Sequence, residues 1–201
     1  VIRIEGVPSL RGIEYSIIPD RIEAGTFMCA AAITGGDVTL KNVVPEHLRA
    51  PILKLEEAGV TIEKAATELR VIASDRLLPI EVETTPYPGF PTDLQQPFVA
   101  CMTVADGTSV IRETIFDRFR YVDELRRMGA DIKTERETAI IRGVPKLTGA
   151  PVEITDLRAG AALAIAALAA EGTTELYGIE ILDRGYEGFE DKLRALGAAA
   201  K

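Results

Sequence analysis

The 201-residue chain contains one histidine and two cysteines. These are too few to form the Cys and His clusters by which proteins usually hold zinc. Cys29 and Cys101 both lie in apolar runs of helical type, so we expect buried thiols in a reducing compartment such as the cytoplasm. His47 stands apart from both. We therefore expect neither a metal site nor a bound cofactor.

Long hydrophobic runs and an excess of basic charge are also missing. The longest apolar run, Ala159 to Ala170, is rich in alanine and falls short of the roughly 20 residues that cross a bilayer, so it predicts a buried helix. No signal-peptide pattern is present, and because residue 1 is Val we expect the chain to begin inside a longer protein. A net charge of −8 argues against non-specific binding to nucleic acid, which requires a basic surface.

What is present is an ordinary folded composition, 47% hydrophobic and 27% charged, arranged in three similar units. Each unit has a strand-like run, an Asp, an apolar helix, a turn with Gly, a second strand and a second helix that ends at Gly. The corresponding residues are Asp20, Asp93 and Asp156, the turn glycines Gly36, Gly107 and Gly172, and the helix-ending glycines Gly59, Gly129 and Gly197. We expect one domain with repeats over about residues 1–75, 76–143 and 144–201.

These units predict βαβαββ modules of an α/β fold with parallel strand pairs and right-handed crossovers. The first helix of each unit is apolar all round and is expected at the centre, with three small sheets outside. The expected strands are 2–5, 15–18, 38–40, 60–63, 68–72, 80–84, 108–111, 131–134, 138–141, 152–155 and 173–176, and the helices are 22–33, 46–58, 94–104, 122–128, 157–170 and 187–196. The third unit has no closing hairpin. We expect its exposed strand edges to favour completion by another segment or self-association.

Asp93 follows a stiff, proline-rich approach, Thr85-Pro86-Tyr87-Pro88-Gly89-Phe90-Pro91, and precedes an apolar helix. An Asp at such a place is a strong helix N-cap, because its carboxylate accepts backbone N–H groups. The same placement of Asp20 and Asp156 predicts that all three are caps of the repeat.

Four motifs in register carry a resemblance that covers essentially the whole chain. They are Pro19-Asp20-Arg21-Ile22-Glu23-Ala24-Gly25-Thr26-Phe27, Phe90-Pro91-Thr92-Asp93-Leu94-Gln95, Thr155-Asp156-Leu157-Arg158-Ala159, and Asp183-Arg184-Gly185-Tyr186-Glu187 with Lys192-Leu193-Arg194-Ala195-Leu196-Gly197-Ala198. With these motifs the chain resembles the UDP-N-acetylglucosamine 1-carboxyvinyltransferase family, cytoplasmic enzymes of peptidoglycan synthesis. The resemblance implies one of two similar domains, each an inside-out α/β barrel of three βαβαββ units. The second domain, with its reactive Cys, and the N-terminal strands would be partners, and this chain alone would be inactive.

The resemblance also implies roles for particular residues. The substrates are phosphoenolpyruvate and UDP-N-acetylglucosamine, and Asp93 matches the residue that binds the sugar and is the candidate general base. Arg158 and Arg118 would hold the carboxylate of phosphoenolpyruvate and Arg184 its phosphate, since the guanidinium fork suits both anions. The motif around Phe116 is one residue shorter than is usual, so Arg118 or Arg120 faces the pocket. The backbone of Ile115 would neighbour the sugar in either register.

Two alternatives stay open at this point. One is a domain of the related 3-phosphoshikimate 1-carboxyvinyltransferase, which the resemblance implies would have the same fold. The other is a scaffold or binding module without catalysis, because half of the implied active site is missing from the chain.

Overall fold

The computed structural model describes residues 1–200, and Lys201, the last residue of the expected third unit, lies outside the described residues. The helices are α1 (Arg21–Ile33), η1 (Pro45–Leu48), α2 (Arg49–Glu57), η2 (Thr92–Leu94), α3 (Gln95–Met102), α4 (Val122–Arg127), α5 (Leu157–Leu168), α6 (Ile179–Leu182) and α7 (Phe189–Ala195). The strands are β1 (Asp37–Lys41), β2 (Thr61–Lys64), β3 (Glu68–Ile72), β4 (Glu81–Glu83), β5 (Thr108–Arg112), β6 (Asp131–Glu135), β7 (Thr138–Arg142), β8 (Leu147–Thr148), β9 (Pro151–Glu153), β10 (Ala170–Glu171) and β11 (Glu175–Tyr177).

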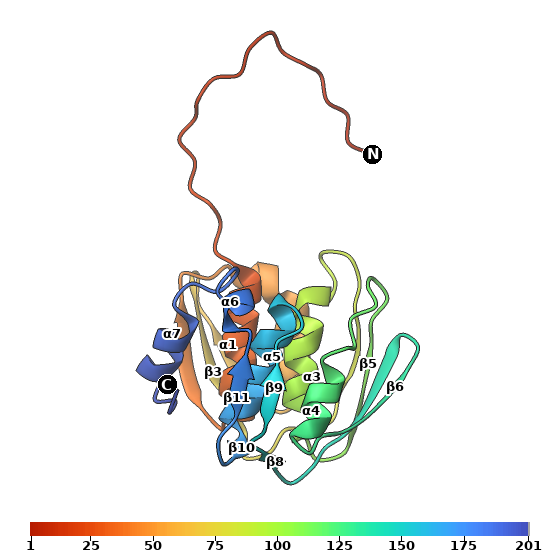
Figure 1. Ribbon diagram of the computed structural model, residues 1–201. Coiled ribbons are helices and arrows are strands. Elements are labelled where there is room, and N and C mark those ends of the chain that lie inside the picture. The colour runs from red at the N-terminus through yellow and green to blue at the C-terminus, as the bar shows by residue number, and fades with distance from the viewer. Residues whose placement is uncertain (201) are drawn as a thin grey trace.

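The three apolar helices α1, α3 and α5 pack against one another at the centre, and the sheets lie around them (Figure 1). Every residue of α3 is buried, and so are nearly all residues of α1 and the stretch Ala159–Ala166 of α5. A helix that is apolar on all sides would expose apolar side chains to water on any face left uncovered. Such a helix is therefore buried. This confirms the predicted inside-out arrangement.

The second unit has the most complete sheet, with strand order β4-β5-β7-β6. β4 and β5 are parallel and are joined through α3, whereas β7 pairs antiparallel with both β5 and β6. The first unit has β1-β3-β2, which lacks a counterpart of β4. The third unit has the parallel pair β9 and β11 without a hairpin beyond β11 in the described chain. The predicted parallel pairs are thus confirmed in the second and third units.

The predicted strands at 2–5 and 15–18 were wrong. Residues 1–20 form an arm without regular secondary structure that leads away from the body (Figure 1). The arm exposes large apolar side chains, among them Ile2, Ile4 and Ile17. Alternating apolar residues favour a strand, but a strand exists only where a neighbour accepts and donates its backbone hydrogen bonds. The arm has no such neighbour in the described chain.

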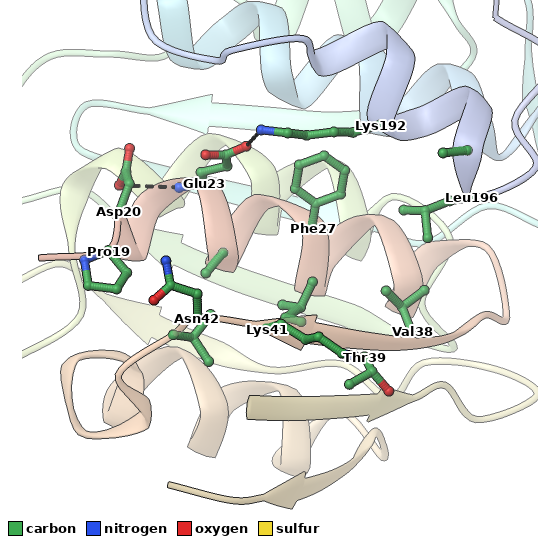
Figure 2. Close-up of a pocket in the computed structure, with 14 residues that line it drawn as sticks. Pro19, Asp20, Glu23, Phe27, Val38, Thr39, Lys41, Asn42, Lys192 and Leu196 are labelled. Atoms are coloured by element: carbon green, nitrogen blue, oxygen red, sulfur yellow. Dashed lines mark hydrogen bonds and ion pairs between the residues drawn. The ribbon is translucent and has the colours of Figure 1, made fainter. Parts of the chain in front are cut away.

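Two hollows lie beside β1, the edge strand of the first sheet, which no strand of the arm covers. The one in Figure 2, about 440 Å³, is bounded by α1, β1 and α7, and the ion pair between Glu23 and Lys192 (2.5 Å) spans one side of it. All residues from Val38 to Val43 line it. Because alternate side chains of a strand point to opposite faces, contact with consecutive residues means that the hollow runs along the strand edge. The second hollow, about 1140 Å³, lies between β1, α5, β11 and α7.

We predict that Gly143→Ala destabilises the domain, because the added Cβ would lie 1.7 Å from the carbonyl oxygen of Ala105. Backbone hydrogen bonds from Gly143 to Gly107 (2.9 Å) and from Val144 to Thr103 (2.7 Å) hold the two segments at this distance. The free energy of unfolding should fall by about 2 kcal/mol or more, as measured by urea denaturation. Gly12→Ala is the matched control, since no atom lies within 4 Å of the added Cβ. Equal stability of the two variants would contradict the close approach.

Candidate functional site

The N-terminal ends of the three central helices meet at one end of the domain. Asp156, just before α5, accepts weak hydrogen bonds from Nε2 of Gln96 in α3 (3.3 and 3.4 Å). Arg158 in the first turn of α5 reaches Asp93, just before α3. Thr26 of α1 shares a hydrogen bond with Tyr186 (2.9 Å), whose ring lies under Arg158. The positive ends of three helix dipoles thus converge here, which favours an anion.

Asp20 and Asp156 are helix N-caps, as predicted. The Asp20 carboxylate accepts the backbone N–H of Ile22 (2.7 Å), and that of Asp156 accepts the N–H groups of Arg158 and Ala159 (both 3.0 Å). The same prediction for Asp93 was wrong. Asp93 lies inside the 3₁₀ turn η2, whose cap position is Pro91, and its side chain accepts no backbone hydrogen bond that would cap a helix.

The Asp93 carboxylate is bound by two arginines instead. Arg118 donates through Nη1 to Oδ1 (2.6 Å), and Arg158 lies with Nε and Nη2 at 3.4 and 3.3 Å from Oδ2. The side chains are 34% exposed for Asp93, 28% for Arg118 and 15% for Arg158. Two cations around one anion leave the cluster with a net positive charge at a partly solvated surface.

Arg158 contacts both the Asp93 carboxylate and the ring of Tyr186. Its guanidinium lies 5.4 Å from the centre of the Tyr186 ring, a cation–π distance. Burial acts to lower the pKa of Arg158, but Tyr186, Asp93 and Asp20 outweigh it, so the pKa is raised and the side chain stays charged. Burial has the opposite effect on the Tyr186 hydroxyl and raises its pKa. Within residues 1–200, Nη1 of Arg158 is buried and has no hydrogen-bond partner, which leaves a charged donor for an anionic ligand.

Arg118 and Arg120, between which the sequence left the choice of site residue open, have different surroundings in the structure. Arg118 stacks on the ring of Phe116 (4.6 Å) and pairs with Asp93, whereas Arg120 is exposed. Ile115 lies on the same loop, 37% exposed. Its N–H is bonded to Glu113 (2.8 Å). The site therefore combines Asp93, Arg118 and Arg158, with Ile115 on the adjoining loop.

Arg184 is not brought into this cluster. It is exposed in the turn after α6, two residues before Tyr186. None of the hydrogen bonds or ion pairs within residues 1–200 involves its side chain. Neither of the two hollows described above is lined by Asp93, Arg118, Arg158 or Arg184. The candidate site lies outside both hollows and is partly exposed to solvent. No cluster of His, Cys, Asp and Glu within residues 1–200 could hold a metal ion.

Sequence reasoning missed three residues that shape the site. Glu113 is buried and accepts four hydrogen bonds. The side-chain amide of Gln96 donates to Asp156, and the ring of Tyr186 packs against the guanidinium of Arg158. Glu113 had a readable signal, because it continues the inward register of Ser109 and Ile111 in β5, where a charge is unusual. Tyr186 lay within a quoted motif, but its contact with α5 depends on tertiary packing.

Three units of βαβαββ type, of which the second is complete, surround buried helices. With a carboxylate and arginines at the shared helix ends, they define a domain of the enolpyruvyl transferase type. A family model described as EPSP synthase (3-phosphoshikimate 1-carboxyvinyltransferase) matches residues 1–193. The chain belongs to this family.

Among its relatives, UDP-N-acetylglucosamine 1-carboxyvinyltransferase 2 of Symbiobacterium thermophilum is 58% identical over 198 residues, which are 98% of this chain and 47% of the relative. The UDP-N-acetylglucosamine 1-carboxyvinyltransferase of Desulfofundulus thermocisternus is 56% identical over 200 residues, 98% of this chain and 82% of the relative. The chain spans about half the length of most of the curated relatives it matches.

Solved structures agree on the fold. The enolpyruvyl transferase NikO from Streptomyces tendae superposes with a TM-score of 0.84 at 28% identity, over 92% of this chain and 44% of that one. EPSP synthase from Acinetobacter baumannii gives 0.72 at 24% identity, over 90% and 46%. Within residues 1–200 no helix is long and apolar enough to cross a membrane.

The ion pair between Asp93 and Arg158 should be measurable by a double-mutant cycle. We predict that Asp93→Asn and Arg158→Met, alone and together, give a coupling energy of about 1 kcal/mol in urea denaturation, because the pair is partly shielded from water. The coupling should shrink in 1 M NaCl. The exposed pair Glu83–Arg112 (3.5 Å) is the control and should give less than about 0.5 kcal/mol. A cycle for Asp93 no larger than this control would contradict the geometry.

Proposed function

We propose that this chain forms one domain of a UDP-N-acetylglucosamine 1-carboxyvinyltransferase, which transfers the enolpyruvyl group of phosphoenolpyruvate to the 3′-hydroxyl of UDP-N-acetylglucosamine. Relatives at 53–58% identity carry this name. The observation that carries the proposal is the Asp93 cluster, in which a carboxylate and the unpartnered Nη1 of Arg158 lie at three convergent helix ends.

The chemistry requires a base beside a hydroxyl and cations beside two anionic groups. The sugar hydroxyl loses its proton as its oxygen attacks C2 of the enol, while C3 gains a proton. Phosphate then leaves from C2 as C3 loses a proton, which restores the double bond of the enolpyruvyl group. Asp93 is the proposed base. Arg118 and Arg158 would receive the carboxylate of phosphoenolpyruvate, Arg184 the phosphate, and the backbone of Ile115 would adjoin the sugar.

The ion pairs suggest how binding could activate Asp93. A carboxylate whose two oxygens accept hydrogen bonds from arginines is not free to accept the proton of a hydroxyl. When an anionic substrate occupies Arg118 and Arg158, their hydrogen bonds are shared with it and Asp93 is released toward the hydroxyl. The cluster is open to water on this chain, so closure by the second domain of the complete enzyme would supply the desolvation that strengthens the base.

A non-catalytic binding module is the second candidate, and the open, half-built site favours it. Calorimetry with UDP-N-acetylglucosamine tests the binding half of the first proposal. We predict weak binding to the isolated chain that Asp93→Ala abolishes, because the carboxylate is the proposed partner of the sugar hydroxyl. Asp37→Ala, on β1 and bonded to Arg70 (2.7 Å), is the control and should bind as the parent does. Binding that survives Asp93→Ala would remove Asp93 from the sugar site.

Turnover requires a complete enzyme, which a chimera provides. This chain replaces the matched half of the Symbiobacterium thermophilum relative, and release of phosphate is followed with both substrates. We expect activity with UDP-N-acetylglucosamine and none with shikimate 3-phosphate, and Asp93→Asn should lower kcat by about 10²- to 10⁴-fold, since general-base catalysis is lost. Activity with shikimate 3-phosphate would favour the sister enzyme. A folded but inactive chimera, or turnover by the isolated chain, would contradict the two-domain proposal.

A further inference from the structure

We infer that Glu113 is a positioning residue for the Asp93 cluster, an inference that rests on the function proposed above. Glu113 follows β5 and is 1% exposed. A carboxylate is costly to bury unless it is paired or fully hydrogen-bonded. No lysine or arginine within the described 1–200 pairs with it, so hydrogen bonds alone compensate for its burial.

The two oxygens of Glu113 accept four hydrogen bonds. Oε1 accepts from the Thr84 hydroxyl (2.8 Å) and from the backbone N–H groups of Ile115 (2.8 Å) and Phe116 (3.2 Å). Oε2 accepts from the Thr92 hydroxyl (2.8 Å). The Thr84 hydroxyl itself accepts the N–H of Thr114 (2.9 Å), which leaves its proton for Glu113.

These bonds join the two segments that carry the ion pair. Thr92 is the neighbour of Asp93 in η2, and Ile115 and Phe116 begin the loop that places Arg118 on Asp93. Phe116 also supports the Arg118 guanidinium through its ring. The Glu113 carboxylate therefore fixes the positions of both Asp93, the proposed base, and Arg118, which pairs with it.

A purely structural role would act on stability alone, and the chain offers a control for it. Glu124 is another buried carboxylate, 9% exposed, which accepts the backbone N–H of Glu153 (3.1 Å) on β9. It lies outside the Asp93 cluster and the segments bonded to Glu113. Glu124→Gln should therefore change stability without changing the geometry of Asp93.

The test uses the chimera described above with Glu113→Gln and Thr92→Val. Both substitutions keep side-chain size, and Thr92→Val removes only the hydrogen bond that the Thr92 hydroxyl donates to Glu113. We expect kcat to fall on the order of 10-fold to 100-fold with KM little changed, because the base is misplaced rather than the binding groups removed. The double variant should lose no more than the worse single one. Thr92→Ser, which retains the hydroxyl, should recover most of the turnover lost in Thr92→Val.

Wild-type kcat in folded Glu113→Gln and Thr92→Val chimeras, or an equal loss in Glu124→Gln, would overturn the inference. If the parent chimera shows no turnover, the proposed function fails, and the positioning role of Glu113 is tested separately in the isolated chain. In the isolated chain, the guanidinium NMR signals of Arg118 should shift and broaden in Glu113→Gln and Thr92→Val and stay unchanged in Glu124→Gln. Unchanged Arg118 signals in all three would overturn the positioning itself.

Discussion

The mutual burial of α1, α3 and α5 is the constraint on which the rest of the structure depends. Because all three helices are apolar on nearly every side, only a central position covers them, and the sheets must then lie outside. The packing also aligns the helix starts at one end, where the interactions of Arg158 and of Asp156 cross between neighbouring helices. The same contacts that bury the core therefore create the charged surface at its end.

The three units complete this plan to different degrees. Within residues 1–200, the second has a four-stranded sheet, whereas the first lacks a strand beside β1 and the third lacks a hairpin beside β11. Both open edges border the larger hollow, and the apolar arm of residues 1–20 lies unpaired. Exposed strand edges favour pairing with further chain segments. The chain spans about half the length of most of the curated relatives it matches.

The repeat, the central helices and the parallel pairs could all be predicted from the sequence, because apolar periodicity and turn glycines are local signals. The arm was mispredicted for the same reason: its alternating residues favour a strand, but the partner is not local. Asp93, Arg118 and Arg158 were found through motif resemblance, yet their ion pairs join residues far apart in sequence. Glu113 escaped notice, since only the folded loop shows that Thr84, Thr92, Ile115 and Phe116 converge on it.

Asp93 differs from Asp20 and Asp156, its two counterparts in the repeat, in the groups that its carboxylate binds. Asp20 and Asp156 accept backbone N–H groups at their helix starts, whereas both oxygens of Asp93 lie against arginine side chains. In the second unit the turn η2 stands before α3, with Pro91 at the cap position. Asp93 is thereby freed from capping while it stays near the positive helix ends, and the two arginines that hold it are groups that an anionic substrate can compete for.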